Sequence, residues 1–151
     1  MMYHAIVRQN VRKLFEALGR GDVDHAVAGM APRFEHIFPG DHCLGGVRHT
    51  PAGIGRWLER LMRVLPGINF QIKHMAVSGT PWRTTVVVEW RDFATLVDGS
   101  QYVNDGAHVI QLRWGKVAVL HAYLDTQVMI DALRTMQTGG VPEAGAPMIE
   151  D

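Results

Sequence analysis

The chain has 151 residues, which is the length of one ordinary domain. It carries 15 basic and 15 acidic residues, so no net charge draws it to nucleic acid or to an anionic membrane, and we expect neither as a partner. The single cysteine, Cys43, the lack of a signal-peptide pattern and the lack of a long apolar run indicate a cytoplasmic protein.

The N-terminal third of the chain predicts two amphipathic helices. Apolar residues recur at helical spacing over residues 7–18, until Gly19 and Gly21 interrupt the pattern. Asp22 is placed to cap a short second helix that reaches Met30. We expect Pro32 to end that helix.

A short strand and a third helix are predicted next. Residues 34–38 are typical of a strand, and the turn-rich stretch 39–46 follows them. Thr50 is placed as a helix cap and Pro51 as the first helical residue, and the apolar spacing then continues until residues 66–67, which are Pro and Gly.

The second half of the chain is dominated by runs of β-branched and aromatic residues with turn signals between them. They predict four strands in sequence, over residues 68–77, 83–96, 101–113 and 116–124. Asp125 can cap a last helix, which completes a domain over residues 1–138. The tail over residues 139–151 is rich in Gly, Pro and Ala, and its composition indicates a flexible extension.

This order of elements predicts an α+β fold. Helices gathered before a run of sequential strands are expected on one face of an antiparallel sheet. Because long strands twist and the helices cover one side, the sheet should curve into a cone with an apolar hollow for a small hydrophobic organic molecule.

The chain resembles the nuclear transport factor 2-like superfamily over nearly its whole length. The residues that carry the resemblance are the helix junction at 17–24 and the segments 38–40, 44–46, 102–104, 115–117 and 123–126, and the later segments look like the SnoaL-like polyketide cyclase branch. The resemblance implies a cone-shaped, cystatin-like fold with three N-terminal helices and a C-terminal helix. It does not choose a reaction, because members include isomerases, cyclases, hydrolases, dehydratases and proteins without catalysis.

The resemblance places few of the catalytic groups of known relatives in this chain. At the positions of the ketosteroid isomerase Tyr, base and second oxyanion donor, this chain has Leu14, Phe38 and His108. The His of SnoaL-like cyclases corresponds to His108, whereas their Asp corresponds to Ala122. The Asp-Arg-Asp set of limonene epoxide hydrolase corresponds to Asp92, Trp90 and again Ala122.

His108 is the best single candidate for chemistry, because an imidazole can act as base, acid or hydrogen-bond donor near neutral pH. Because side chains alternate along a strand, it shares one face with Asn104, and this face is expected to line the hollow. The alternative is a core His whose hydrogen bonding is satisfied by one neighbour. By the same alternation His36 shares a face with Phe34 and Phe38, and it faces the hollow if that face is inward.

Asp92 and Trp90 depend on the register of the central hairpin. A three-residue loop at residues 98–100 puts them on the side of His108, whereas a two-residue loop puts Glu89 and Arg91 there. We favour the three-residue loop, because it also points the apolar residues before Trp90 inward. A buried Asp92 suits a general base; the alternative is a surface ion pair.

We predict a catalytic set of His108, Asp92 and His36. The expected wall of the binding site consists of Leu14, Phe34, Phe38, Trp57, Trp90, Tyr102, Asn104, Leu120 and Ala122. We predict no metal, since the spacing of Asp41, His42 and Cys43 with the nearby histidines matches no closed zinc pattern, and we predict no cofactor.

The outer face of the sheet is expected to be unusually apolar, which predicts a homodimer, as is common in the superfamily. The residues expected there are Val87, Phe93, Val103, Val109, Val117, Val119 and Tyr123.

Two functions follow from the sequence. The first is an isomerase, cyclase or lyase that uses His108 as acid or base with Asp92 or His36 as its partner. The second is a ligand-binding or accessory domain without catalysis, which the apolar residues at Leu14, Phe38 and Ala122 favour.

Overall fold

The N-terminal helices form where one side of the chain is apolar. In the computed structural model, which describes residues 2–151, α1 (Met2–Arg20) buries its predicted apolar stripe, and Asp22 caps α2 (Val23–Ala28) by accepting from the backbone N–H of His25. The prediction that α2 continues to Met30 was wrong, because β1 (Met30–Phe38) begins there. Pro32 fits in this strand since the pairing of β1 is irregular between Met30 and Glu35.

A two-stranded edge and a third helix follow. β2 (Gly46–Arg48), which the sequence analysis missed, pairs antiparallel with the end of β1. α3 (Pro51–Val64) starts as predicted, with the Thr50 side chain accepting from the N–H of Gly53.

The four predicted strands are confirmed as β3 (Asn69–Thr80), β4 (Arg83–Thr95), β5 (Gln101–Arg113) and β6 (Lys116–Leu124). They pair antiparallel in sequence order, and β1 joins the sheet parallel to β6, so that the strand order is β2-β1-β6-β5-β4-β3.

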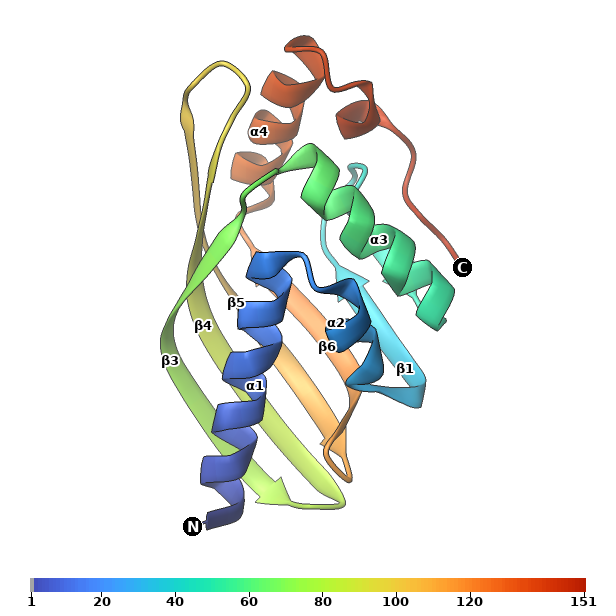
Figure 1. Ribbon diagram of the computed structural model, residues 1–151, viewed down its shortest axis with the longest axis vertical. Helices are drawn as coiled ribbons and strands as arrows, with labels where there is room; N and C mark the ends of the chain where they lie inside the picture. Colours follow the sequence, from blue (N-terminus) through green and yellow to red (C-terminus); the bar gives the residue numbers. More distant parts are fainter. Residues whose placement is uncertain (1) are drawn as a thin grey trace.

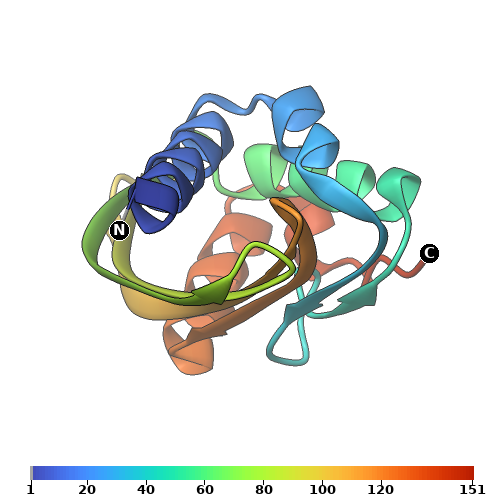
Figure 2. The ribbon, with the colours of Figure 1, turned by 90° about the horizontal axis from the view of Figure 1, so that it is seen from below.

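The sheet is strongly curved, and its concave face is covered by α1, α2 and α3 (Figure 2). α4 (Thr126–Thr138), capped by Asp125 as predicted, closes one end of the cone (Figure 1). The predicted α+β cone is therefore confirmed. No helix within residues 2–151 is long and apolar enough to cross a membrane.

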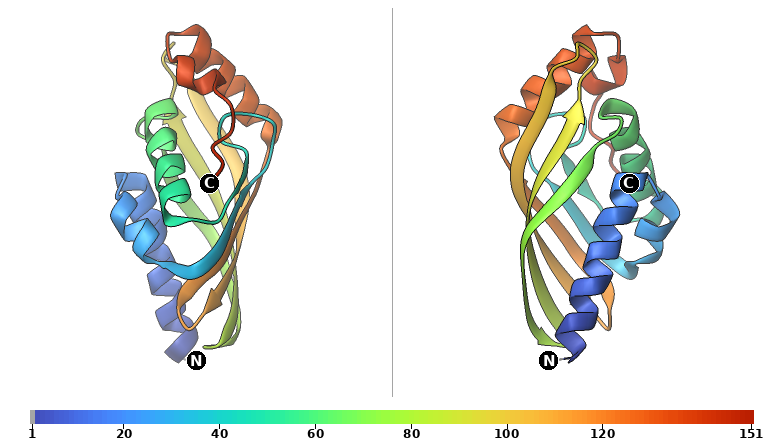
Figure 3. Two further views of the ribbon diagram at one scale, coloured as in Figure 1. Left: turned by 90° about the vertical axis from the view of Figure 1, so that its right-hand side faces the viewer. Right: turned by 60° about the vertical axis from the view of Figure 1, so that its left-hand side comes forward.

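The C-terminal tail, whose composition indicates a flexible extension, lies against the domain. It forms the short 3-10 helix η1 (Pro142–Gly145) and then runs along α3 (Figure 3). Glu143 accepts hydrogen bonds from Arg60 and Arg63, and Asp151 accepts from the backbone N–H of Thr50. Composition alone missed these contacts because their partners lie about 80 to 100 residues earlier in the chain.

The outer face of the sheet carries most of the apolar side chains expected there. Val87, Val103 and Tyr123 are 39%, 43% and 51% exposed. Val117 is an exception: it is buried, because a register shift in the β5–β6 pairing places it opposite Leu112 on the inner face. Dimerisation through this face stays a prediction.

Candidate functional site

A narrow apolar cavity lies between the N-terminal helices and the concave face of the sheet. The space in it that the centre of a water-sized sphere can reach is only about 30 Å³. Its ionisable wall residues are His36, Asp92 and His108, one each from β1, β4 and β5. The rest of the wall consists of Leu14, Leu18, Ala26, Met30, Phe38, Ile54, Trp57, Leu58, Leu61, Ile68, Phe70, Trp90, Leu120 and Met129.

The structure thus brings the three predicted catalytic residues to one cavity. Of the predicted wall, Leu14, Phe38, Trp57, Trp90 and Leu120 are in place. The other four are buried but do not line the cavity: Phe34, Tyr102, Asn104 and Ala122. Tyr102 and Asn104 lie near the start of β5, on the side of α4, and Asn104 donates to the carbonyl of Asp125. Ala122 lies opposite His108 in the β5–β6 pairing and is fully enclosed.

Several wall residues were not singled out in the sequence. Ile54, Leu58 and Leu61 belong to the apolar stripe of α3, and Leu18 belongs to that of α1. Their helical periodicity marked them as buried, but it carries no information on which buried side chains border empty space.

The β4–β5 hairpin brings Trp90 and Asp92 to the side of His108, as favoured. Leu96 and Ser100 are joined by a backbone hydrogen bond, so the three loop residues are 97–99 rather than 98–100. Because side chains alternate with a period of two, this shift of the pairing by two leaves every side chain on its predicted face.

A hydrogen bond between two cavity residues fixes the state of His108. The indole N–H of Trp90 donates to His108 Nδ1 over 2.8 Å, so the proton of the neutral imidazole is on Nε2. Burial lowers the pKa of His108 to about 3, and His121 contributes in the same direction. His108 is therefore a neutral hydrogen-bond donor near pH 7, and it is poorly suited to take up a proton.

The Trp90 ring occupies space that a side chain on β5 would need. Gly106 lies opposite Trp90, and a Cβ atom at this position would come within 2.6 Å of the ring. A glycine at 106 therefore allows the indole to reach His108.

His36 has the same tautomer for a similar reason. The Arg48 Nε–H donates to His36 Nδ1 over 3.0 Å, and an arginine offers only donors. Burial lowers the pKa of His36 well below its ordinary value, and the charge of Arg48 lowers it further. His36 is therefore a second neutral donor in the cavity wall.

Asp92 is the complementary acceptor. It is 2% exposed and forms no ion pair with any of residues 2–151; the neighbouring Arg91 binds Asp105 on the outer face instead. Its Oδ2 lies 3.5 Å from the Tyr102 hydroxyl, and its Oδ1 is buried without a partner among residues 2–151. Burial raises the pKa of Asp92 to about 7, although the Tyr102 contact acts against this rise. Such a carboxylate can both accept and return a proton near neutral pH.

The loop at residues 41–43, which we considered as a metal site in the sequence, lies outside this cavity. His42 and Cys43 border a separate surface pocket next to α4 and the tail, and His42 Nδ1 accepts from the N–H of Leu44. Burial raises the pKa of the Cys43 thiol to about 11. Within the described part of the chain, no three His, Cys, Asp or Glu side chains are grouped to hold a metal ion.

Family comparison agrees with this architecture. The model of the SnoaL-like domain matches residues 11–120, which is most of the chain. The chain therefore belongs to the SnoaL-like domain family, within the NTF2-like fold. A search of curated proteins gave no match.

Solved structures of this fold resemble the chain closely in shape. An NTF2-like protein of unknown function from Burkholderia pseudomallei is 23% identical, with 83% of this chain and 95% of that chain covered and a TM-score of 0.74. TerC, co-crystallised with polyporic acid, is also 23% identical, with 83% and 96% covered and a TM-score of 0.71. The epoxide hydrolase/cyclase-like enzyme SalBIII, which has a role in pyran ring formation in salinomycin, is 15% identical, with 84% and 96% covered and a TM-score of 0.69. At these identities the similarity shows the fold alone.

Replacement of Gly106 by Ala should disconnect Trp90 from His108. The added methyl group would come within 2.5 Å of the backbone oxygen of Tyr123 and 2.6 Å of the indole, so both the strand and the ring must shift, and we expect a loss of about 1 to 3 kcal/mol in the free energy of unfolding. Urea denaturation measures the loss, and tryptophan fluorescence reports the changed environment of the ring. Gly55→Ala is the control, since a Cβ atom at Gly55 meets no other atom within 4 Å. If Gly106→Ala leaves stability and fluorescence unchanged, the tight packing of Trp90 on Gly106 is contradicted.

The raised pKa of Asp92 predicts a pH-dependent stability. Between the ordinary aspartate pKa of 3.8 and about 7, folded Asp92 keeps a proton that the unfolded chain has lost, so its contribution to stability falls as the pH rises. The stability of the native protein relative to Asp92→Asn should therefore fall from about pH 4 to about pH 8, by up to about 4 kcal/mol. Parallel denaturation curves at each pH measure it. A difference that stays constant over this range contradicts the assignment.

Proposed function

We propose that the protein is a cofactor-independent enzyme that moves a proton on a small apolar carbonyl compound, as an isomerase or cyclase does. The observation that carries this proposal is a carboxyl group with a pKa near neutrality, facing the same apolar cavity as two imidazoles fixed as donors. An apolar lining with a few convergent polar groups is the usual character of a site for a small organic molecule.

Asp92 is the proposed general base. A C–H group next to a carbonyl loses its proton to a carboxylate when the resulting enolate oxygen is stabilised. Asp92 accepts the proton through its unpartnered Oδ1 and afterwards returns it to another atom of the same substrate. Return to a different carbon is an isomerisation, whereas attack of the enolate carbon on a second carbonyl of the substrate closes a ring.

The imidazoles stabilise the negative oxygen. His108 and His36 each keep Nδ1 occupied by an accepted hydrogen bond, so each offers an Nε2–H to the substrate. Neutral donors suit this task, because they do not protonate the enolate before it reacts. The proposal exchanges the roles expected from the sequence: the base is Asp92, and His108 is a donor.

The apolar wall serves the same step. A water-poor cavity strengthens the hydrogen bonds to the developing charge and keeps the enolate from solvent. Because little of the free space is wide enough for a water molecule, the wall must move apart to admit a substrate.

The proposal is tested by exchange of solvent deuterium into the α-carbon of small bicyclic ketones such as indanone and tetralone, followed by NMR. We expect the native protein to catalyse the exchange, with a rate that rises with pH as Asp92 loses its proton around pH 7. Asp92→Asn should lower the rate by about 100-fold or more, and His108→Phe by about tenfold or more.

Asp105→Asn is the matched control, because Asp105 is a carboxylate on the neighbouring strand that faces solvent and binds Arg91. Equal exchange rates in Asp92→Asn and the native protein contradict the role of Asp92. Tight binding of the ketones without any exchange favours a ligand-binding domain instead.

A further inference from the structure

Arg48 stands out because it is completely buried and no carboxylate among residues 2–151 binds it directly. Its side chain is 0% exposed, and arginine is rarely enclosed unless a carboxylate binds it. Besides the Nε–H, which binds His36, three of its N–H donors bind backbone carbonyls: Nη1 binds Gly45 over 2.8 Å and Ile149 over 3.0 Å, and Nη2 binds Gly46 over 3.0 Å. No carboxylate within residues 2–151 lies close enough to form an ion pair with it.

This charge lies directly behind the cavity wall. The guanidinium binds His36, and it lies 5.5 Å from the ring centre of Trp57. Both of these residues border the cavity, whereas Arg48 does not. Burial lowers the pKa of Arg48 to about 10, although the nearby carboxylate of Asp151 acts against this, so the side chain keeps its charge at neutral pH. Its field therefore reaches the cavity through little more than one layer of side chains, where water screens it poorly.

The hydrogen bond from Arg48 to His36 transmits the effect of the charge to the cavity. Because Arg48 Nε–H occupies His36 Nδ1, the proton that His36 offers is on Nε2, and the nearby positive charge makes that proton a better donor. The one hydrogen bond that the His36 ring forms within residues 2–151 uses Nδ1, not this Nε2–H. A negatively charged oxygen of a ligand is its natural partner.

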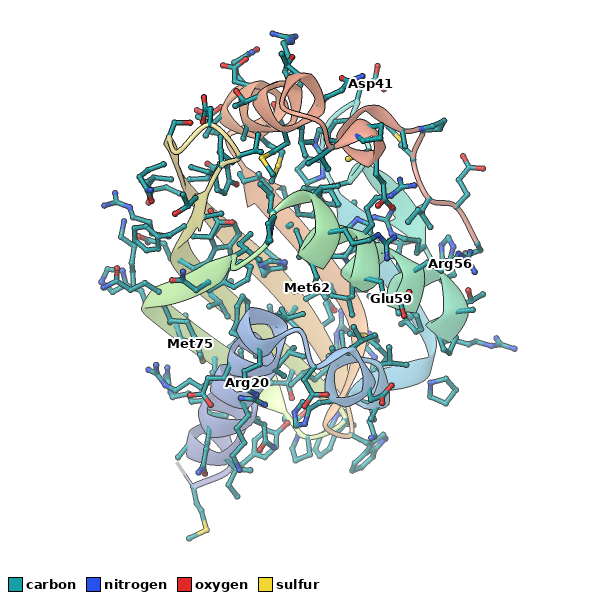
Figure 4. All side chains as sticks on the ribbon, turned by 45° about the horizontal axis from the view of Figure 1, so that its top comes forward. Arg20, Asp41, Arg56, Glu59, Met62 and Met75 are labelled. Atoms are coloured by element: carbon teal, nitrogen blue, oxygen red, sulfur yellow. The ribbon has the colours of Figure 1, made fainter. Side chains whose placement is uncertain are left out.

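The C-terminal segment, residues 146–151, holds Arg48 in this position. It supplies the carbonyl of Ile149, and its end is tied down by Asp151, which accepts from the N–H groups of His49 and Thr50. The N–H of His49 follows Arg48 directly in the chain, so the same anchor fixes the end of β2. Figure 4 shows Arg56 on α3 on the side of this segment, where it binds the carbonyl of Glu150.

We propose that Arg48, acting through His36, makes the cavity a binding site for an organic anion, an apolar body with an enolate or carboxylate oxygen, and that residues 146–151 hold it in place. The inference rests on the proposed function in that it concerns the same cavity, and it makes Arg48 a positioning residue. It narrows the substrate class from small carbonyl compounds to those that are anionic or become so in the reaction.

The test compares ligands that differ in charge but not in shape. Benzoate and naphthoate are anions, and benzamide and naphthamide are their neutral counterparts of equal size. By calorimetry we expect each anion to bind the native protein at least about tenfold more tightly than its amide. Arg48→Met should remove this preference by weakening anion binding while amide binding changes by less than about twofold.

Arg56→Met is the control, because Arg56 is also bonded to a carbonyl of the C-terminal segment but has no contact with His36. It should keep the preference. Nitrogen-15 NMR of the histidines gives a second readout: native His36 should show a proton on Nε2 only, and Arg48→Met should show a mixture of tautomers. Arg48→Lys retains the charge without the planar donor pattern, so it should keep part of the preference and lose the single tautomer.

If Arg48→Met does not fold, deletion of residues 148–151 removes the carbonyl of Ile149 and should weaken both the preference and the tautomer signal. Equal affinity for anions and amides in the native protein overturns the proposal, as do failure of every carboxylate to bind and a preference that survives in Arg48→Met. These measurements need no turnover, so an anion preference without deuterium exchange contradicts the proposed catalysis and leaves this inference standing.

Discussion

The hydrogen bond from Trp90 to His108 is the contact on which the chemistry of the cavity depends. It crosses from β4 to β5, and it requires the hairpin register that places both side chains inside and a glycine at 106 that leaves room for the indole. Because indole only donates, the bond leaves the imidazole one tautomer, and burial then removes its ability to gain a second proton. A residue whose type permits acid, base or donor behaviour is thereby limited to one of the three.

Burial of the three ionisable groups of the wall costs free energy of folding, and the cost depends on how well each group is hydrogen-bonded inside the protein. Each imidazole has one nitrogen satisfied inside the protein, by Trp90 or by Arg48, so that neither must be charged. Asp92 has no such compensation, because its one contact with Tyr102 is long and its Oδ1 has no partner among residues 2–151. An incompletely satisfied buried group is expected where a ligand, not the protein, completes the hydrogen bonding.

Much of the fold was predictable because it depends on local patterns. The four long strands and the caps at Thr50 and Asp125 follow from side-chain alternation and from turn and cap chemistry, which act over a few residues, whereas alternation left open which face of its strand His36 is on. Phe34 and Tyr102 were placed in the wall because alternation gives a side chain's face but not its depth along the strand. Arg48 gave no signal at all, since an arginine in a Gly-rich stretch normally lies in solvent. Its burial depends on the carbonyl of Ile149, 101 residues later in the chain.

The positions at which relatives keep reactive groups explain why family membership alone does not transfer a reaction. Leu14 and Phe38 belong to the apolar wall, and Ala122 is enclosed beside it. The polar groups enter the same cavity at other points instead, with Asp92 on β4 and His36 on β1. A cone lined by strands offers an inward position at every second residue, so a base and its donors can change strands while the fold stays the same. The cavity therefore has to be interpreted from its own atoms, and those atoms define one carboxyl acceptor facing two neutral donors, with a buried positive charge behind the second donor.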